Sequence, residues 1–176
     1  DKSLYLDNAA AIADAGAAHV TVHARTKVEG YKPPAHWEYI ARIREYVKIP
    51  VIANGEIWNH EDYARCREVS GCSDVMIGRG QISQPDLSKV IKAERDGNPV
   101  DPIGWDIIVG FLLDLVAQSQ HRMQPRYVHG RVKQWLHHLK RRFPEAKVLF
   151  DQVKVVNDLD LLKQMLLDEQ MRAEQR

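Results

Sequence analysis

Apolar residues in the first 97 positions follow two patterns. Three short runs rich in β-branched residues, "HVTVH", "VIAN" and "SDVMIG", predict β-strands at residues 19–23, 51–54 and 73–78. Longer segments place apolar residues at helical spacing, and they predict α-helices at residues 4–15, 37–47, 61–69 and 85–95. Asn59 or His60 opens the third of these helices, and Gly71 closes it.

The predicted strands are apolar along most of their length and do not alternate with polar residues. This pattern favours a parallel sheet that is buried on both faces. The repeated helix–strand order favours a (β/α) architecture. A closed barrel of this kind needs eight strands, whereas this region offers three and begins on a helix. We therefore expect the chain to be the C-terminal part of a larger protein.

The pattern changes at residues 96–104, "DGNPVDPIG", where two glycines and two prolines predict a linker. Beyond it, apolar residues at helical spacing predict one amphipathic helix from Trp105 to Val116, a second from Val132 to Phe143 and a third from Leu159 to Leu167. We expect a first, (β/α) domain over residues 1–97 and a small antiparallel helical bundle over residues 98–176.

Two predicted strands run into glycine-containing triplets, Asn54-Gly55-Glu56 and Gly78-Arg79-Gly80. In (β/α) barrels the working loops follow the carboxyl ends of the strands, and glycine there lets backbone N–H groups approach an anion. The two triplets therefore predict a phosphate site, to which Arg79 adds a charge-assisted contact. The alternative is that the glycines only allow tight turns.

Other polar residues also follow predicted strand ends. His23 and Arg25, in "VHART", follow the first strand, where a histidine can hydrogen-bond a cofactor and an arginine can hold a phosphate. The alternative is a structural histidine and a surface arginine. Glu56 is a candidate base, but a carboxylate that caps the next helix is the better interpretation.

Charge is distributed unevenly along the chain, although the net charge is only +1. Residues 115–144 hold seven arginines and lysines, four of the eight histidines and no acidic residue, a pattern that is typical of polyanion binding. On the second helix of the bundle the cations lie outside the apolar face. Such a surface suits RNA, where backbone contacts dominate. A solvated helix face is the alternative.

Other classes of site and location are disfavoured. No apolar run approaches the roughly 20 residues that cross a bilayer, so no membrane partner is expected. The two cysteines, Cys66 and Cys72, have no zinc-site partners at ligand spacing, and we expect reduced thiols in a cytoplasmic protein. The sequence contains no convincing nucleophile or proton donor, and no metal site is expected.

Together these segments resemble the tRNA-dihydrouridine synthases, FMN-dependent reductases of uridine in tRNA. "VTVHART" with the following "GY", "PVIANGEI", "VMIGRG" and "DLSKVIK" are similar to motifs in the second half of that family's barrel. "GRVKQWLHHLKRRFPEA" followed by "LFDQVKVVN" resembles the C subfamily, which modifies uridine 16. The resemblance covers essentially the whole chain. It implies the C-terminal part of an FMN-binding TIM (β/α)8 barrel, followed by an all-α, helical tRNA-binding domain.

The resemblance also implies roles for individual residues. In FMN binding these are the first triplet, the two residues matching the phosphate-binding part and a histidine near the flavin: Asn54, Gly55, Glu56, Gly78, Arg79 and His23. In RNA binding they are two residues of the loop bordering the RNA channel and four of the helical domain: Arg25, Tyr31, Arg131, Lys133, His138 and Lys154.

The family reaction needs a residue that this sequence lacks. NADPH reduces FMN, hydride then passes from the flavin to the uracil ring, and a cysteine in a Cys-Pro motif protonates that ring. No Cys-Pro occurs here, and Cys66 and Cys72 do not replace it. The resemblance implies that the full-length enzyme is a monomer. We expect this chain alone to be inactive and to bind FMN weakly or not at all.

Two alternatives stay open. A non-catalytic RNA-binding module explains the basic helix equally well, but it needs no glycine triplets. Another FMN or sugar-phosphate barrel enzyme explains the glycines, but it leaves the acid-free basic segment without a role.

Overall fold

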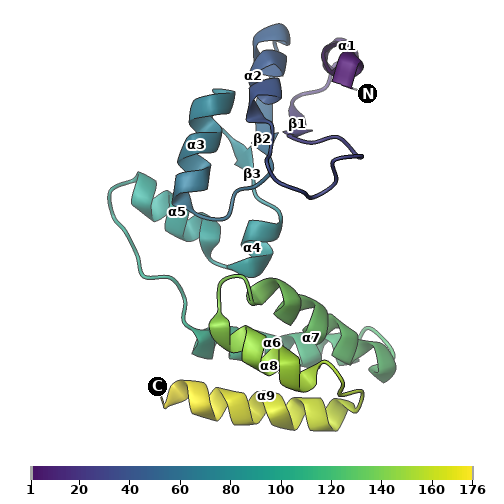
Figure 1. Ribbon diagram of the computed structural model, residues 1–176, viewed down its shortest axis with the longest axis vertical. Coiled ribbons are helices and arrows are strands. Elements are labelled where there is room, and N and C mark those ends of the chain that lie inside the picture. Colours follow the sequence, from purple (N-terminus) through teal and green to yellow (C-terminus); the bar gives the residue numbers. More distant parts are fainter. Residues whose placement is uncertain (1, 176) are drawn as a thin grey trace. The chain divides into compact units, whose positions relative to one another are not determined.

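The computed structural model describes residues 2–175, which form two compact units, each with its own apolar core (Figure 1). The first unit comprises the residues up to 81 together with 87–100. The second comprises 82–86 and the residues from 101 onward. None of the helices in the described part of the chain is both long and apolar enough to cross a membrane.

A three-stranded parallel sheet forms the centre of the first unit. Its strands are β1 (Val20–His23), β2 (Val51–Asn54) and β3 (Val75–Met76), in the order β1-β2-β3. All three predicted strands are confirmed, although β3 is only two residues long. His23 lies opposite Asn54, and Asn54 lies opposite Met76. The three strands therefore end together, at one edge of the sheet.

The helices of the first unit are η1 (Lys2–Leu4), α1 (Tyr5–Asp14), α2 (Trp37–Tyr46), α3 (His60–Ser70), α4 (Arg79–Ser83) and α5 (Leu87–Arg95), of which α4 extends into the second unit. The four predicted helices are confirmed. The short α4 was not predicted, because its five residues are too few to show a helical period. The predicted ends of α3 are also confirmed. The Asn59 side chain accepts a hydrogen bond from the Asp62 N–H (2.7 Å), and Gly71 has a left-handed backbone.

The two faces of the sheet differ. Val51 and Ala53 are buried with apolar residues of α2 and α3, which lie beside the strands in Figure 1. On the opposite face Thr21, His23 and Met76 are exposed. The prediction that both faces would be buried is therefore wrong for the described residues, because the helices of this unit supply apolar side chains to one face only. Of the predicted site residues, His23 and Asn54 lie on this open face.

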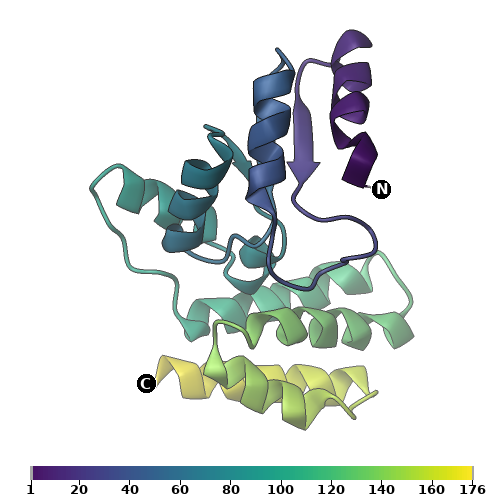
Figure 2. The ribbon, with the colours of Figure 1, turned by 45° about the horizontal axis from the view of Figure 1, so that its top comes forward.

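Four helices form most of the second unit and lie alongside one another (Figure 2): α6 (Trp105–Gln120), α7 (Pro125–Leu139), α8 (Pro144–Val153) and α9 (Leu159–Glu174). Trp105, at the start of α6, donates its Nε1–H to Glu169 near the end of α9 (2.9 Å). These two helices are therefore antiparallel, as the sequence predicted.

The predicted second helix of the bundle is too long. We expected it to run to Phe143, but α7 ends at Leu139 and Pro144 begins α8. Proline disfavours a helical conformation in the residue before it, and Phe143 is extended (φ −112°, ψ 111°). Its side chain is still buried in the core, which is why it matched the apolar pattern. Arg141 and Arg142 lie in the turn between the helices.

Residues 82–86 pack with the helical unit. Trp135 on α7 donates its Nε1–H to the Ile82 carbonyl (2.9 Å), and the Ile103 N–H donates to the Asp86 carboxylate (2.8 Å). The chain thus enters the second unit, returns to the first for α5, and enters the second again.

Candidate functional site

A line of hydrogen bonds joins the carboxyl ends of the three strands. His23 Nδ1 lies 2.6 Å from Asn54 Oδ1, and Asn54 Nδ2 donates to the Met76 carbonyl (2.7 Å). Because an amide oxygen can only accept, His23 must donate from Nδ1. The imidazole Nε2 is then left for a further partner. The structure therefore brings together two predicted site residues, His23 and Asn54, on the open face.

A second cluster lies in the loops that follow the same strand ends. Arg25 Nη2 lies 2.7 Å from Glu56 Oε1 as an ion pair, and Arg79 Nη2 donates to the same oxygen (2.8 Å). Trp58 donates its indole N–H to Oε2 of Glu56 (3.1 Å). One carboxylate thus binds groups from the loops after β1 and β2 and from the start of α4, which follows β3.

These contacts keep Glu56 ionised. Burial by itself would raise the pKa of the Glu56 carboxyl, but hydrogen bonds from Arg25 and Trp58, together with the charges of Arg25 and Arg79, lower it below its usual value. A carboxylate held in this way is a poor base. The prediction that Glu56 caps the next helix is wrong, because the Asn59 side chain fills that role.

Two aromatic rings hold the guanidinium group of Arg79. Its central carbon lies 4.5 Å from the ring centroid of Tyr31 and 5.1 Å from that of Trp58, within the range of cation–π attraction. The Arg79 side chain keeps 31% of its surface exposed. It can therefore reach a ligand while it contacts Glu56.

The glycines of the two triplets have different structural roles. Gly55 has φ 129°, a conformation that side chains rarely adopt. A Cβ on Gly80 would lie 2.1 Å from the Ile57 carbonyl oxygen, so only glycine fits there. Gly78 has neither constraint, and a Cβ there would meet no other residue within 4 Å. The tight-turn interpretation therefore applies to Gly55, whereas Gly80 is required by close packing and Gly78 borders open space.

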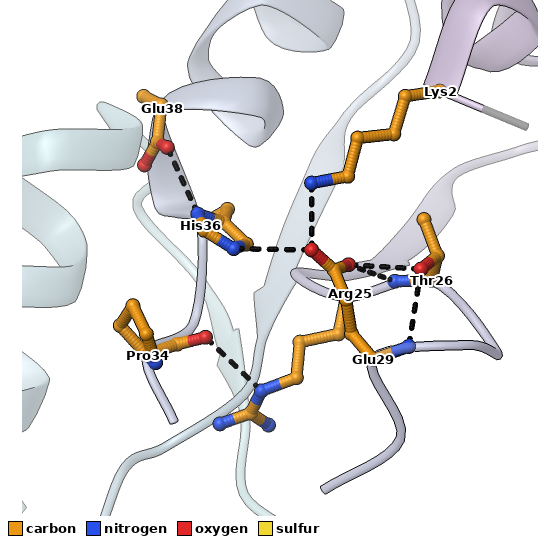
Figure 3. A network of polar contacts seen from close by, with 7 residues as sticks. All are labelled: Lys2, Arg25, Thr26, Glu29, Pro34, His36 and Glu38. Atoms are coloured by element: carbon orange, nitrogen blue, oxygen red, sulfur yellow. Dashed lines mark hydrogen bonds and ion pairs between the residues drawn. The ribbon is translucent and has the colours of Figure 1, made fainter. Parts of the chain in front are cut away.

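Arg25 starts a loop that is held by its own polar contacts (Figure 3). Its side chain has no exposed surface, and its Nε donates to the Pro34 carbonyl (3.2 Å). The interpretation of Arg25 as a surface arginine is therefore wrong. Its Nη1 is buried and has no hydrogen-bond partner among the described residues.

Glu29 organises the middle of this loop (Figure 3). Its carboxylate accepts from Lys2 Nζ (2.6 Å) and from the backbone N–H and hydroxyl of Thr26 (2.8 and 2.9 Å), and lies 3.2 Å from His36 Nε2. The Lys2 hydrogen bond, followed by those from Thr26, lowers the pKa of Glu29 to about 2. Beside it lies a cavity of about 120 Å³, which Tyr5 and Tyr39 also line.

The residues predicted to bind RNA in the second unit lie on α7 and at the end of α8. Arg131 is exposed, and Lys133 donates to the Asn157 side chain (3.4 Å). His138 is half-buried beside the His137 ring. Lys154 pairs with Asp151 at 2.9 Å on the surface. Exposed ion pairs of this kind are weak, so they do not prevent exchange for a phosphate.

Cys66 and Cys72 are buried and free. Burial is the main cause that raises the pKa of the Cys66 thiol to about 11, so this thiol stays protonated at neutral pH and is a poor nucleophile. The described residues contain no group of three His, Cys, Asp or Glu side chains that could hold a metal ion.

Sequence reasoning missed three contacts of the site. Trp37 donates its indole N–H to the Gly55 carbonyl (2.9 Å), Trp58 binds Glu56, and Tyr31 stacks on Arg79. The available signal was the indole N–H of each tryptophan, since a buried indole usually has an acceptor. Nothing in the sequence pointed to the stacking of Tyr31, 48 positions before its partner.

Comparisons with known proteins find relatives over most of this chain. The family model for dihydrouridine synthase matches residues 1–171. The chain is 51% identical over 161 residues to the tRNA-dihydrouridine(16) synthase of Pseudomonas putida, covering 92% of this chain and 50% of that protein. It is 48% identical over 158 residues to the enzyme of that name from Ralstonia nicotianae, covering 90% of this chain and 48% of that protein. The chain thus spans about half the length of the curated relatives it matches.

Proposed function

Because this chain belongs to the dihydrouridine synthase family, we propose that it forms part of an enzyme that reduces a uridine of tRNA to 5,6-dihydrouridine. The names of its relatives favour uridine 16 as the target. The proposed cofactor is FMN, with NADPH as the reductant. A tRNA substrate favours a cytoplasmic location.

The observation that carries this proposal is the convergence of three loops at one edge of the parallel sheet. Working loops of (β/α) barrels follow the carboxyl ends of the strands. Here those ends bring His23, Asn54 and Arg79 to one edge of the sheet, beside the open space at Gly78. The open face and the two outer strands, each with an edge that no other described strand pairs, support a place for this unit in a TIM barrel.

The residues present fit FMN. The space at Gly78 can admit a phosphate, Arg79 offers a partly exposed guanidinium group, and the first triplet borders the same edge. FMN, when bound, supplies the hydride. Asn54 orients the His23 ring through Nδ1, so that Nε2 is available to hold the flavin.

The proton for the uracil ring does not come from the thiols of this chain. Cys66 and Cys72 are both buried, and the pKa of Cys66 is raised to about 11. We therefore propose that this chain alone does not reduce uridine, and that a residue outside it supplies the proton.

The second unit is the proposed tRNA-binding part. Arg131, Lys133 and Lys154 supply the cations, and His138 supplies a ring that can stack or hydrogen-bond. In the first unit Tyr31 is 70% exposed and can contact the RNA. Arg25 is buried, and we propose that it does not contact the RNA but holds the RNA-bordering loop through its hydrogen bond to the Pro34 carbonyl.

The test is to incubate the complete enzyme that carries this sequence with FMN, NADPH and an unmodified tRNA transcript. We expect dihydrouridine at position 16, detected by mapping the modified nucleotide. Dihydrouridine at another position alone would contradict the target, and no dihydrouridine would contradict the activity. The chain of residues 1–176 alone is the control, and product from it would contradict its proposed inactivity.

A further inference from the structure

One carboxylate contacts the segments that follow all three strands of the first unit. Arg25 and Arg79 reach the same oxygen of Glu56 at 2.7 and 2.8 Å, and Tyr31 lies on Arg79 at 4.5 Å. We propose that Glu56 is a positioning residue that couples the phosphate site at Arg79 to the loop carrying Tyr31, and thereby links flavin binding to tRNA binding. This inference rests on the proposed function.

The backbone of Glu56 shows how tightly its side chain is placed. Its φ is 53°, and no other non-glycine residue in the described part of the chain has a positive φ. This conformation is unfavourable for a residue with a Cβ, and it persists only where the surroundings over-determine it. Here the two arginines bind Oε1 and Trp58 binds Oε2. The carboxylate is therefore fixed in position and orientation.

The charges of the cluster do not cancel, because two guanidinium groups share one carboxylate. Arg25 is fully buried and depends on Glu56, since a buried charge without a partner is strongly unfavourable. Arg79 is partly exposed and borders the space at Gly78. An anion that enters this space competes with Glu56 for Arg79, while Arg25 stays in place.

A change at Arg79 is transmitted to the loop in two ways. The ring of Tyr31 stacks on the guanidinium group, so the position of Arg79 decides whether this contact forms. At the other end of the loop, Arg25 holds the Pro34 carbonyl while it pairs with Glu56. The loop and the phosphate site therefore shift together. By thermodynamic linkage, the factor by which FMN changes the affinity for tRNA is the factor by which tRNA changes the affinity for FMN.

The test compares the affinity of the complete enzyme for an unmodified tRNA transcript in its flavin-free and FMN-saturated forms. We expect FMN to change the Kd for tRNA about five-fold or more. Glu56→Gln keeps the shape of the side chain but removes its charge, and Tyr31→Leu removes the stacked ring. A direct contact to tRNA that either variant loses changes both Kd values by the same factor, so both variants should bring the ratio of the two Kd values towards one. Glu68→Gln and Tyr46→Leu replace exposed residues of the same types and should keep the wild-type ratio.

The outcomes separate this inference from the function on which it rests. A wild-type ratio of one, or an unchanged ratio in both variants, overturns the coupling and leaves the function intact. Failure of the wild-type enzyme to bind FMN or tRNA overturns the function itself. If circular dichroism shows that Glu56→Gln does not fold, Tyr31→Leu decides the matter, because Tyr31 is an exposed residue.

Discussion

Gly78 and Gly80 stand two residues apart and fulfil different requirements. Gly80 is needed for packing, since a Cβ would lie 2.1 Å from the Ile57 carbonyl oxygen. Gly78 has no such neighbour, so its lack of a side chain has no packing explanation. The space beside Gly78 is therefore available for the phosphate that we propose there.

Gly78→Leu in the complete enzyme should therefore reduce FMN occupancy, because the new side chain fills the space proposed for the phosphate. Its melting temperature without flavin should stay close to that of the wild type, since surface changes cost roughly 0.5 kcal/mol or less. Gly80→Ala should instead lower the melting temperature of the flavin-free protein, because overpacking costs about 1–3 kcal/mol of stability. Flavin absorbance and thermal unfolding measure the two effects, and a normal flavin spectrum for Gly78→Leu would contradict the phosphate site.

Glu29 should give the first unit a component of acid sensitivity. Its pKa is about 2 in the folded protein and its usual value is 4.5. A lowered pKa stabilises the folded state at pH values above 4.5, and this contribution is lost as the pH falls towards 2. Glu29→Gln should lower the melting temperature at neutral pH, and the difference from wild type should vanish near pH 2. Thermal unfolding at several pH values checks this, and a difference that is independent of pH would refute it.

Among the elements, α6 and α9 are joined by a buried polar contact. Glu169 is buried, and Trp105 on α6 donates to it across the core. The Arg172 guanidinium group reaches the same carboxylate from the surface at 3.0 Å. Loss of a donor to a buried carboxylate is unfavourable because the oxygen cannot recover its bond to water.

Trp105→Phe should destabilise the helical unit by about 1–3 kcal/mol, because it removes this donor. Trp135→Phe is the matched control, since Trp135 also donates its indole N–H, but to a carbonyl in an exposed contact. Chemical denaturation of both variants compares them. Equal losses in the free energy of unfolding would show that the buried Trp105 hydrogen bond stabilises the unit no more than the exposed Trp135 one.

The elements that could be predicted are those with a local signal. Asn59 and Gly71 identify the two ends of α3, and runs of β-branched residues identify all three strands. Phe143 misled the prediction, because its burial is tertiary while Pro144 sets its backbone. The site shows the same division. Strand ends identified the residues, but the pairing of Glu56 with arginines 31 positions before and 23 after it depends on the register of the sheet, which the sequence does not contain.

At the scale of the whole molecule, basic residues are concentrated in one segment of the chain, residues 115–144, although neither unit carries a large net charge. The acid-free segment 115–144 lies entirely within the helical unit. Arg131→Glu with Lys133→Glu in the complete enzyme should weaken tRNA binding and reduce its salt dependence, because fewer counterions are released. Lys89→Glu with Lys163→Glu makes the same change of charge outside residues 115–144. Binding measured at several salt concentrations tests this, and an unchanged salt slope would contradict the assignment.

The open sheet should make the isolated chain associate. Among the described strands, β1 and β3 each have one unpaired edge, and Met76 on the open face is 53% exposed. Unpaired edges promote contacts between chains. Sedimentation of residues 1–176 at several concentrations should therefore show self-association, whereas the complete enzyme should be a monomer. A monomeric chain with a sharp melting transition would contradict this.

The course of the chain through residues 82–86 has a consequence for proteolysis. These residues contribute Ile82 and Asp86 to the helical unit, although α5 of the first unit follows them. A protease that cuts between 98 and 104 therefore divides the polypeptide, but it leaves one strip of the helical unit on the N-terminal fragment. The two fragments should co-purify after such a cut, and a C-terminal fragment produced from residue 101 onward lacks the acceptor for the Trp135 indole.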